Sequence, residues 1–261
     1  MKHSFLDRYS DGDSFMHRLD PRTKFGTALL FILAVALTPP GSWRAFGLYL
    51  VIITALLLPA RVPILYILKR SLVVMPFVAM LAIFIPFFKG GEVAGSYNVW
   101  LWQLTVTYSG IQVLINILLK SWLSILSLIW LTSTTRLPDL LQGLERMRMP
   151  RVLVMLMSFM YRYLFILVDE VMRMKQARDS RSFGGRSASG GWQIRTVGNM
   201  IGTLFIRSYE RGERVYAAMS ARGFDGNIRT LNHLSFRLSD ALFGMGYSLI
   251  LIFVGIFSQL Y

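Results

Sequence analysis

The chain has 261 residues, of which 54% are hydrophobic and 16% charged, and its mean hydropathy is +0.50. One soluble domain of this size needs far less apolar surface, so the composition disfavours a soluble protein and favours a membrane protein. The 28 Lys and Arg outnumber the 14 Asp and Glu, but long apolar runs separate the basic clusters. This pattern favours membrane surfaces over nucleic acid as the partner of the positive charge. The absence of cysteine excludes disulfides, thiolate metal sites and a cysteine nucleophile.

The first 24 residues are polar and lack the pattern of a cleaved signal peptide. Apolar runs that follow predict five membrane-spanning helices, the first two joined as a hairpin. These runs are residues 25–38, 43–58, 71–88, 108–131 and 241–257. Residues 92–107, between the third and fourth runs, are predicted to be a loop with Trp100 and Trp102 as an interfacial anchor.

The segment from Arg136 to Arg237 has a different composition. It contains 17 Lys and Arg against 8 Asp and Glu, which is about two-thirds of the net charge of +14. Basic segments stay on the cytoplasmic side of membranes, so we expect this one to be cytoplasmic. The predicted elements are a short helix at 138–147, a long helix from 151 to about 178, a Gly/Ser-rich linker at 182–191 and a long helix at 192–219.

The two long helices are both amphipathic. Residues 152–168 are apolar enough to resemble a further span, but Arg162 lies in their middle, and an interfacial helix fits this pattern better. In the second long helix, apolar residues gather on one side and Arg207, Arg211 and Arg214 on another.

These elements predict an all-α, polytopic membrane protein with about five transmembrane helices and long amphipathic cytoplasmic helices. The expected divisions are an N-terminal tail with four spans (1–135), a cytoplasmic segment (136–238) and a C-terminal span (239–261). A cytoplasmic N-terminus keeps nearly all of the basic clusters on one side, which predicts this orientation in the plasma membrane.

Enzyme motifs were sought and are absent: there is no Walker A loop, no G-x-S-x-G, no H-E-x-x-H and no G-x-G-x-x-G. The sequence therefore predicts no catalytic residue and no nucleotide site. His3 and His17 flank Asp7, Asp11 and Asp13, but no ligand spacing repeats, so we expect no metal site and no cofactor in this chain.

Two helix ends carry an arginine among small residues. They are residues 176–182 (QARDSRS) and 218–224 (AMSARGF). Small neighbours let the backbone of another protein approach, and a guanidinium offers a planar fork of donors to a carboxylate. Each end is a candidate docking tip. An alternative of equal weight is that these arginines complement the helix dipole and anionic lipid headgroups.

Nearly the whole chain resembles the transmembrane T component of energy-coupling factor (ECF) transporters. The resemblance lies in Leu-Asp-Pro-Arg-Thr-Lys at 19–24, in the order of the apolar runs, and in two Ala-Arg-Gly type motifs that end the coupling helices of this family. The second motif matches at Ala221, Arg222 and Gly223. The first corresponds to Ser180, Arg181 and Ser182, or less well to Ala177, Arg178 and Asp179, and neither has the usual glycine. Residues 6–9, 17–21 and 213–219 resemble the cobalt or nickel branch, CbiQ.

The resemblance implies a non-enzymatic coupling subunit. Its partners would be two cytoplasmic ATPase subunits, which bind the ATP, and a substrate-binding membrane subunit. The resemblance also allows a small accessory membrane subunit. Arg222 and Arg181 (or Arg178) would pair with acidic residues of the ATPases, and the substrate would be cobalt or nickel. The alternatives are a vitamin-type T component and a stand-alone carrier or channel lined by Lys120, Asn116 and Arg162, since buried polar residues in membranes are functional candidates.

Overall fold

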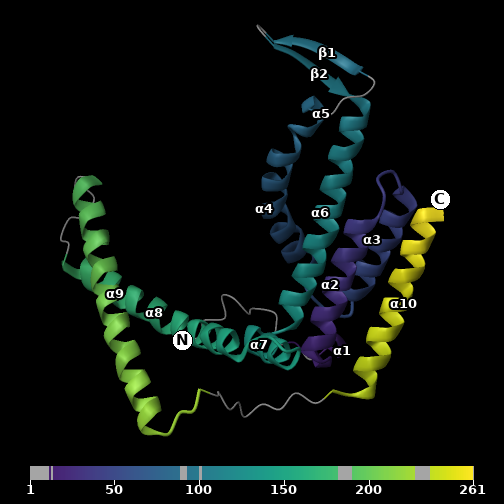
Figure 1. The fold of residues 1–261 in the computed structure, drawn as a ribbon. Coiled ribbons are helices and arrows are strands. Elements are labelled where there is room, and N and C mark those ends of the chain that lie inside the picture. Colours follow the sequence, from purple (N-terminus) through teal and green to yellow (C-terminus); the bar gives the residue numbers. More distant parts are fainter. Residues whose placement is uncertain are drawn as a thin grey trace. The chain divides into compact units, whose positions relative to one another are not determined.

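The computed structural model describes Gly12 and residues 14–88, 93–99, 102–181, 190–226 and 236–260. Helices dominate it, which confirms the all-α class (Figure 1). Its elements are α1 (Phe15–Arg18), α2 (Pro21–Leu37), α3 (Trp43–Leu57), α4 (Ile64–Ala82), α5 (Ile85–Phe88), β1 (Val93–Val99), β2 (Trp102–Thr107), α6 (Tyr108–Thr134), α7 (Leu137–Arg146), α8 (Arg151–Arg181), α9 (Gly190–Ala221) and α10 (Leu238–Leu260).

The chain divides into two compact units. One, the helical bundle, consists of residues 4–143 and 234–261, and the other consists of residues 1–3 and 144–233. The boundary falls inside α7, between Gly143 and Leu144. The second unit holds α8 and α9, which we call the α8–α9 pair.

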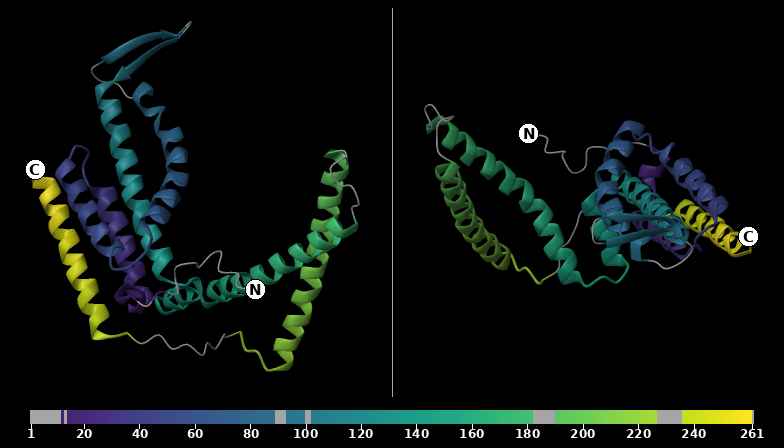
Figure 2. Two further views of the ribbon diagram at one scale, coloured as in Figure 1. Left: turned by 180° about the vertical axis from the view of Figure 1, so that it is seen from behind. Right: turned by 90° about the horizontal axis from the view of Figure 1, so that it is seen from above.

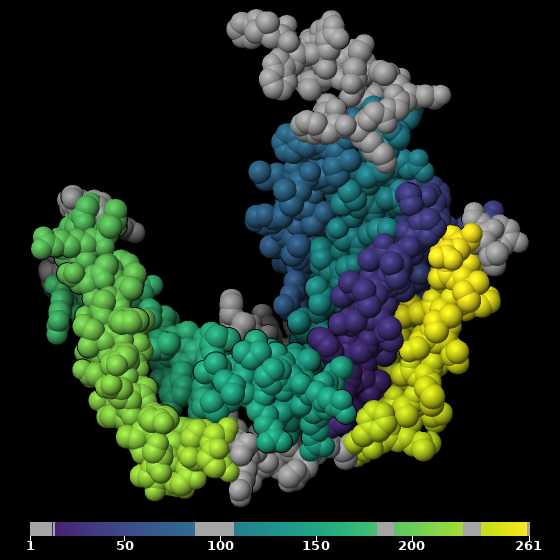
Figure 3. Space-filling view, in the orientation of Figure 1, coloured from purple at the N-terminus to yellow at the C-terminus, as the bar shows by residue number. Residues whose placement is uncertain are grey.

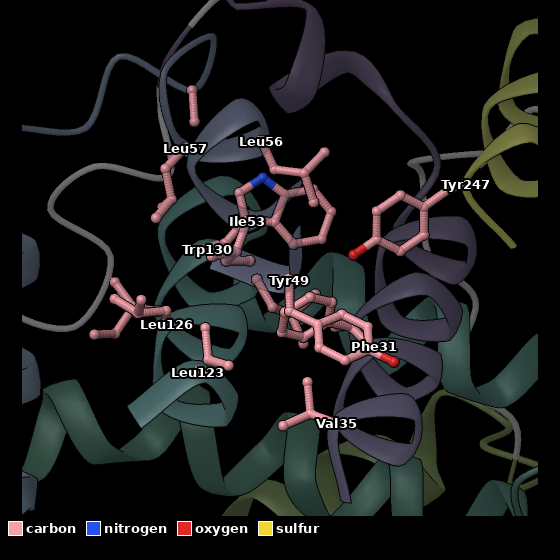
Figure 4. Close-up of a cluster of buried hydrophobic side chains, with 14 of the residues drawn as sticks. Phe31, Val35, Tyr49, Ile53, Leu56, Leu57, Leu123, Leu126, Trp130 and Tyr247 are labelled. Atoms are coloured by element: carbon pink, nitrogen blue, oxygen red, sulfur yellow. The ribbon is translucent and has the colours of Figure 1, made fainter. Parts of the chain in front are cut away.

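The bundle is organised around α6, which packs against α2, α3, α4 and α5, while α10 packs along α2 and α3 (Figures 2 and 3). Large apolar side chains fill the space between these helices (Figure 4). Trp130 of α6 and Tyr49 of α3 are fully buried there, and Tyr49 meets Phe31 of α2 edge to face at 5.7 Å. Close packing of this kind joins helices in lipid, where the hydrophobic effect between them is absent.

Four described helices are long and apolar enough to cross a membrane. They are α4, α6, α8 and α10, the last over Leu238–Gln259. The shorter α2 (17 residues) and α3 (15 residues) fall below the roughly 20 residues of an untilted span. By length and composition α8 could also cross a membrane, whereas the sequence favoured an interfacial position for its residues 152–168.

The predicted loop at 92–107 is wrong. Strands β1 and β2 form an antiparallel hairpin in which Val99 is paired with Trp102. The segment contains Val, Tyr, Trp and Thr at alternating positions, residue types that favour strands. Trp100 lies outside the described residues, so the interfacial anchor stays a prediction.

The predicted linker at 182–191 needs a correction at its end. Gly190 and Gly191 belong to the first turn of α9, and residues 182–189 lie outside the described residues. The first four N–H groups of a helix have no partner within the helix, and glycine is accepted at this end. The helix is therefore longer than the apolar pattern that predicted it.

Gly110 allows α6 to touch the segment of α5. A Cβ atom at this position would lie 2.5 Å from Pro86 Cα, which is a backbone atom that a side chain cannot move aside. We expect Gly110→Ala to destabilise the bundle by about 1–3 kcal/mol, the usual cost of overpacking. Thermal unfolding in detergent measures this, with Gly47→Ala in α3 as the control, since nothing lies within 4 Å of a Cβ at Gly47. Equal melting temperatures for the two variants would contradict the close contact.

Candidate functional site

The α8–α9 pair is a helical hairpin whose members contact each other near their middles (Figures 1 and 2). Two grooves lie on either side of that contact. The polar groove has a volume of about 670 Å³ and lies between the C-terminal half of α8 and the N-terminal half of α9. The apolar groove, about 400 Å³, lies between the N-terminal half of α8 and the C-terminal half of α9.

Glu170 of α8 joins the two helices. Its carboxylate accepts hydrogen bonds from Arg173 in the same helix, at 2.7 Å, and from Arg207 in α9. Glu170 follows the apolar run 152–168, and its pKa lies below its ordinary value because Arg173, and then Arg207, stabilise the charged form. A lowered pKa means that the ion pair is formed at neutral pH and is lost only as the pH falls through that lowered pKa.

We expect Glu170→Gln to loosen the α8–α9 pair, because the neutral amide cannot hold two guanidinium groups. Pulsed electron paramagnetic resonance between spin labels at Lys175→Cys and Phe205→Cys should then give a broader distance distribution. The absence of native cysteine makes this labelling specific. Glu210→Gln is the matched control, because the ion pair of Glu210 with Arg214, at 3.7 Å, lies within α9. An equal broadening in both variants would show that Glu170 has no special role.

The second predicted tip, Ala221-Arg222-Gly223, lies where α9 ends. Gly223 N donates to Ser220 O at 3.0 Å and Phe224 N donates to Met219 O at 3.1 Å. Gly223 has φ of +75°, a left-handed conformation that glycine adopts without strain. These features define a Schellman motif, which satisfies the last carbonyl groups and turns the chain sharply. The side chain of Arg222 is exposed at this turn.

Phe224, just after this turn, faces the apolar groove between α8 and α9. A Schellman motif usually brings an apolar residue just after the glycine against the last helical turn. Here Phe224 and Met219 both line the apolar groove, opposite Phe159 and Tyr163 of α8. The turn that presents Arg222 therefore lies at the edge of the groove that the two helices share.

The first predicted tip lies at the C-terminal end of α8. Arg178 donates two hydrogen bonds to Asp179 Oδ1, at 2.9 and 2.7 Å, and Ser180 Oγ donates to Gln176 O. Arg181 is exposed in the last turn, and Ser182 lies outside the described residues. Arg178 is thus occupied by a local carboxylate, which makes Arg181 the better candidate for an external one.

Sequence reasoning missed Glu170 and Phe224. The partners in the Glu170–Arg207 pair are 37 residues apart, so no local pattern links them. The expected separation of arginines from apolar residues on α9 is wrong for Arg211, which lines the same groove as Val215 and Met219. The four-residue spacing of these positions, which places them on one helix face, could have revealed this.

Two of the three polar residues proposed for a carrier pathway, Lys120 and Asn116, donate hydrogen bonds to backbone carbonyl groups. Lys120 of α6 donates to Ala36 O and Thr38 O, at 2.9 and 2.7 Å, so it caps the C-terminal end of α2. The side-chain amide of Asn116 donates to Gln112 O. Arg162 is exposed on α8, in the other compact unit. Lys120 therefore stabilises a helix end, which weakens the case for a path through the bundle.

The residues weighed as a cation site lie almost entirely outside the described part of the chain. These are His3, Asp7, Asp11 and Asp13. Among the residues that the structure does describe, no three His, Asp or Glu side chains form a group that could hold a metal ion.

A family model described as a cobalt transport protein, CbiQ, matches residues 12–234. The energy-coupling factor transporter transmembrane protein EcfT of Brevibacillus brevis is 32% identical over 96% of each chain. The EcfT of Listeria innocua is 30% identical over 87% of this chain and 86% of the relative. A putative fused cobalt transport protein CbiMQ of Methanocorpusculum labreanum is 29% identical over 76% of this chain and 33% of the relative.

Proposed function

The chain belongs to the CbiQ family as an EcfT-like transmembrane component of an ECF transporter, and we propose that it couples ATP hydrolysis in separate subunits to the import of Co²⁺ or Ni²⁺. As a T component it is a multi-pass membrane protein and a non-enzymatic subunit that works with ATPase and substrate-binding subunits. The metal ion is suggested by the description of the matched family and by the fused cobalt transport relative. It is the cargo of the transporter, bound by a partner.

One observation carries the proposed mechanism: two arginine-bearing helix ends lie on opposite sides of the Glu170–Arg207 contact. Arg181 lies 11 residues beyond Glu170 and Arg222 lies 15 beyond Arg207, which is about 17 and 22 Å along the helices. Such a separation suits two binding partners better than one. We therefore assign one tip to each of two cytoplasmic ATPase subunits, with Arg181 and Arg222 pairing with acidic residues there.

The apolar surface of the α8–α9 pair supports a role between subunits. Val154 is the only fully buried apolar residue in the described parts of α8 and α9. Large apolar side chains are exposed on both helices, including Leu156, Met160, Ile201 and Phe205. Apolar surface on this scale needs a cover, which membrane or the substrate-binding subunit would supply. A helix packed on both sides then carries a displacement from the ATPases to that subunit.

The topology is part of the proposal. Residues 1–135 and 239–261 form the tail and the membrane helices, and residues 136–238 form the cytoplasmic coupling segment. The N-terminus lies in the cytoplasm, because the opposite orientation would translocate most of the basic residues.

Co-purification with the products of neighbouring genes tests the function. We expect a complex that contains ATPase subunits and a second membrane protein, and that imports radiolabelled Co²⁺ or Ni²⁺ into liposomes only when ATP is present. Uptake by this chain alone would overturn the coupling role in favour of a carrier. Import of a vitamin, with no import of either metal ion, would support the coupling role and contradict the proposed metal cargo.

A further inference from the structure

Lys24 lies at the end of the bundle where α6 finishes, and its side chain is buried. Its Nζ atom donates to Thr134 O at 2.9 Å and to His17 O at 3.0 Å. A buried amine that makes two good hydrogen bonds is costly to remove, because its acceptors lose their partner out of reach of water. The contact therefore ties α2 to the last residue of α6 and to α1.

Thr134 lies where α6 ends and the chain turns toward α7, which begins three residues later at Leu137. The last carbonyl groups of a helix have no partner within the helix, and a cation is favourable beside them. The side chain of Lys24 supplies a hydrogen-bond donor and a positive charge at the C-terminal end of α6.

Acidic residues from α7 and α10 complete the arrangement. The carboxylates of Asp139 in α7, then Asp20 and Asp240, act electrostatically on Lys24. Asp240 accepts hydrogen bonds from Asp20 N at 3.1 Å and from Arg237 N at 2.9 Å. Lys24 is thus linked by charge or hydrogen bonds to the start of α10 and to α7 itself.

The part of α7 that belongs to the bundle also packs on this segment. A Cβ atom at Gly143 would lie 3.4 Å from Pro21 Cβ and 3.5 Å from Arg22 Cγ, at ordinary contact distance. Pro21 is the first residue of α2, and Asp20 caps that helix by accepting from Arg22 N at 2.9 Å. Residues 20–24 therefore meet α7 in two ways: Pro21 and Arg22 lie against Gly143, and Lys24 interacts electrostatically with Asp139.

We propose that Lys24 is a positioning residue: it fixes α7 against the bundle, so that motion of the coupling segment reaches the membrane helices instead of being lost at a loose junction. The inference rests on the proposed function for its consequence in transport. Its structural part, the order of α7, stands by itself.

Lys120 provides a matched control, because it also donates from a lysine Nζ to two backbone carbonyl groups, at the other end of α2. In the purified complex, hydrogen exchange of the α7 amides is measured for Lys24→Met, Lys24→Arg and Lys120→Met. We expect exchange in α7 to rise about tenfold or more in Lys24→Met, since the buried hydrogen bond to Thr134 O and the half-buried one to His17 O are both lost. Lys24→Arg should restore part of the protection, and Lys120→Met should leave α7 as in the unmodified chain.

The transport readout is the number of Co²⁺ or Ni²⁺ ions imported per ATP hydrolysed in liposomes. Lys24→Met should lower this ratio while ATPase subunits still co-purify. An unchanged α7 in Lys24→Met, or equal effects of Lys24→Met and Lys120→Met, would overturn the positioning role. If the unmodified chain captures no ATPase, the proposed function fails, and α7 exchange measured in the chain alone still decides the structural role of Lys24.

Discussion

Arg222→Glu should abolish the ATP-driven uptake of the complex. The Schellman motif at Gly223 presents the exposed Arg222 side chain at a turn whose Phe224 lines the apolar groove between α8 and α9. Loss of one partner from a desolvated charge pair costs about 2–5 kcal/mol in an interface, and reversal of the charge adds repulsion. We therefore expect the affinity for one ATPase subunit to fall about 30-fold or more, since each 1.4 kcal/mol is tenfold.

Binding of the ATPase subunits to the purified chain, measured by biolayer interferometry in nanodiscs, checks this result. Arg195→Glu is the matched control: it makes the same change in charge at an exposed position near the other end of α9. Arg222→Lys keeps the charge and loses the planar fork, so its effect should be smaller but measurable. Equal binding by Arg222→Glu and the unmodified chain would remove this tip from the coupling mechanism.

Hydropathy predicted α2, α3, α6 and α10 because each follows one long apolar run, whereas the predicted run 71–88 is divided between α4, which begins at Ile64, and α5. Helix α6 shows this well: the run 108–131 lies within Tyr108–Thr134. The hairpin of β1 and β2 was missed because short alternating segments carry a weak signal beside such runs. Lys24 and Lys120 were missed as structural groups, since each reaches carbonyl groups more than 80 residues away, in Thr134 and Thr38 respectively.

The candidate site was only partly predictable. Gly223 after a helical pattern indicates a helix end, and the structure adds the positive φ and the two backbone hydrogen bonds of the turn that carries Arg222. The arrangement of the two tips depends on the Glu170–Arg207 contact, which only the packing of α8 on α9 creates. Local motifs therefore locate the arginines, whereas tertiary contacts set their separation and direction.

Arg181→Glu should weaken ATPase binding far more than Arg178→Glu. The sequence left both arginines open as the first docking residue, and their contacts now differ. Arg178 is held by Asp179 through hydrogen bonds of 2.9 and 2.7 Å, so a partner carboxylate would have to compete with a neighbouring one. Arg181 lies one turn nearer to the end of α8, with an exposed side chain.

We expect Arg181→Glu to lower the affinity by about 2–5 kcal/mol, as for a desolvated interface pair, and Arg178→Glu by no more than about 1 kcal/mol, as for a surface charge. The same binding measurement separates the two, and high salt should reduce only the smaller, solvent-screened effect strongly. Asp179→Asn sharpens the comparison, because it releases Arg178 without moving Arg181. If binding then becomes stronger, Arg178 is the docking residue that Asp179 restrains. If Asp179→Asn leaves binding unchanged and Arg181→Glu binds the ATPase weakly, the first tip is assigned to Arg181.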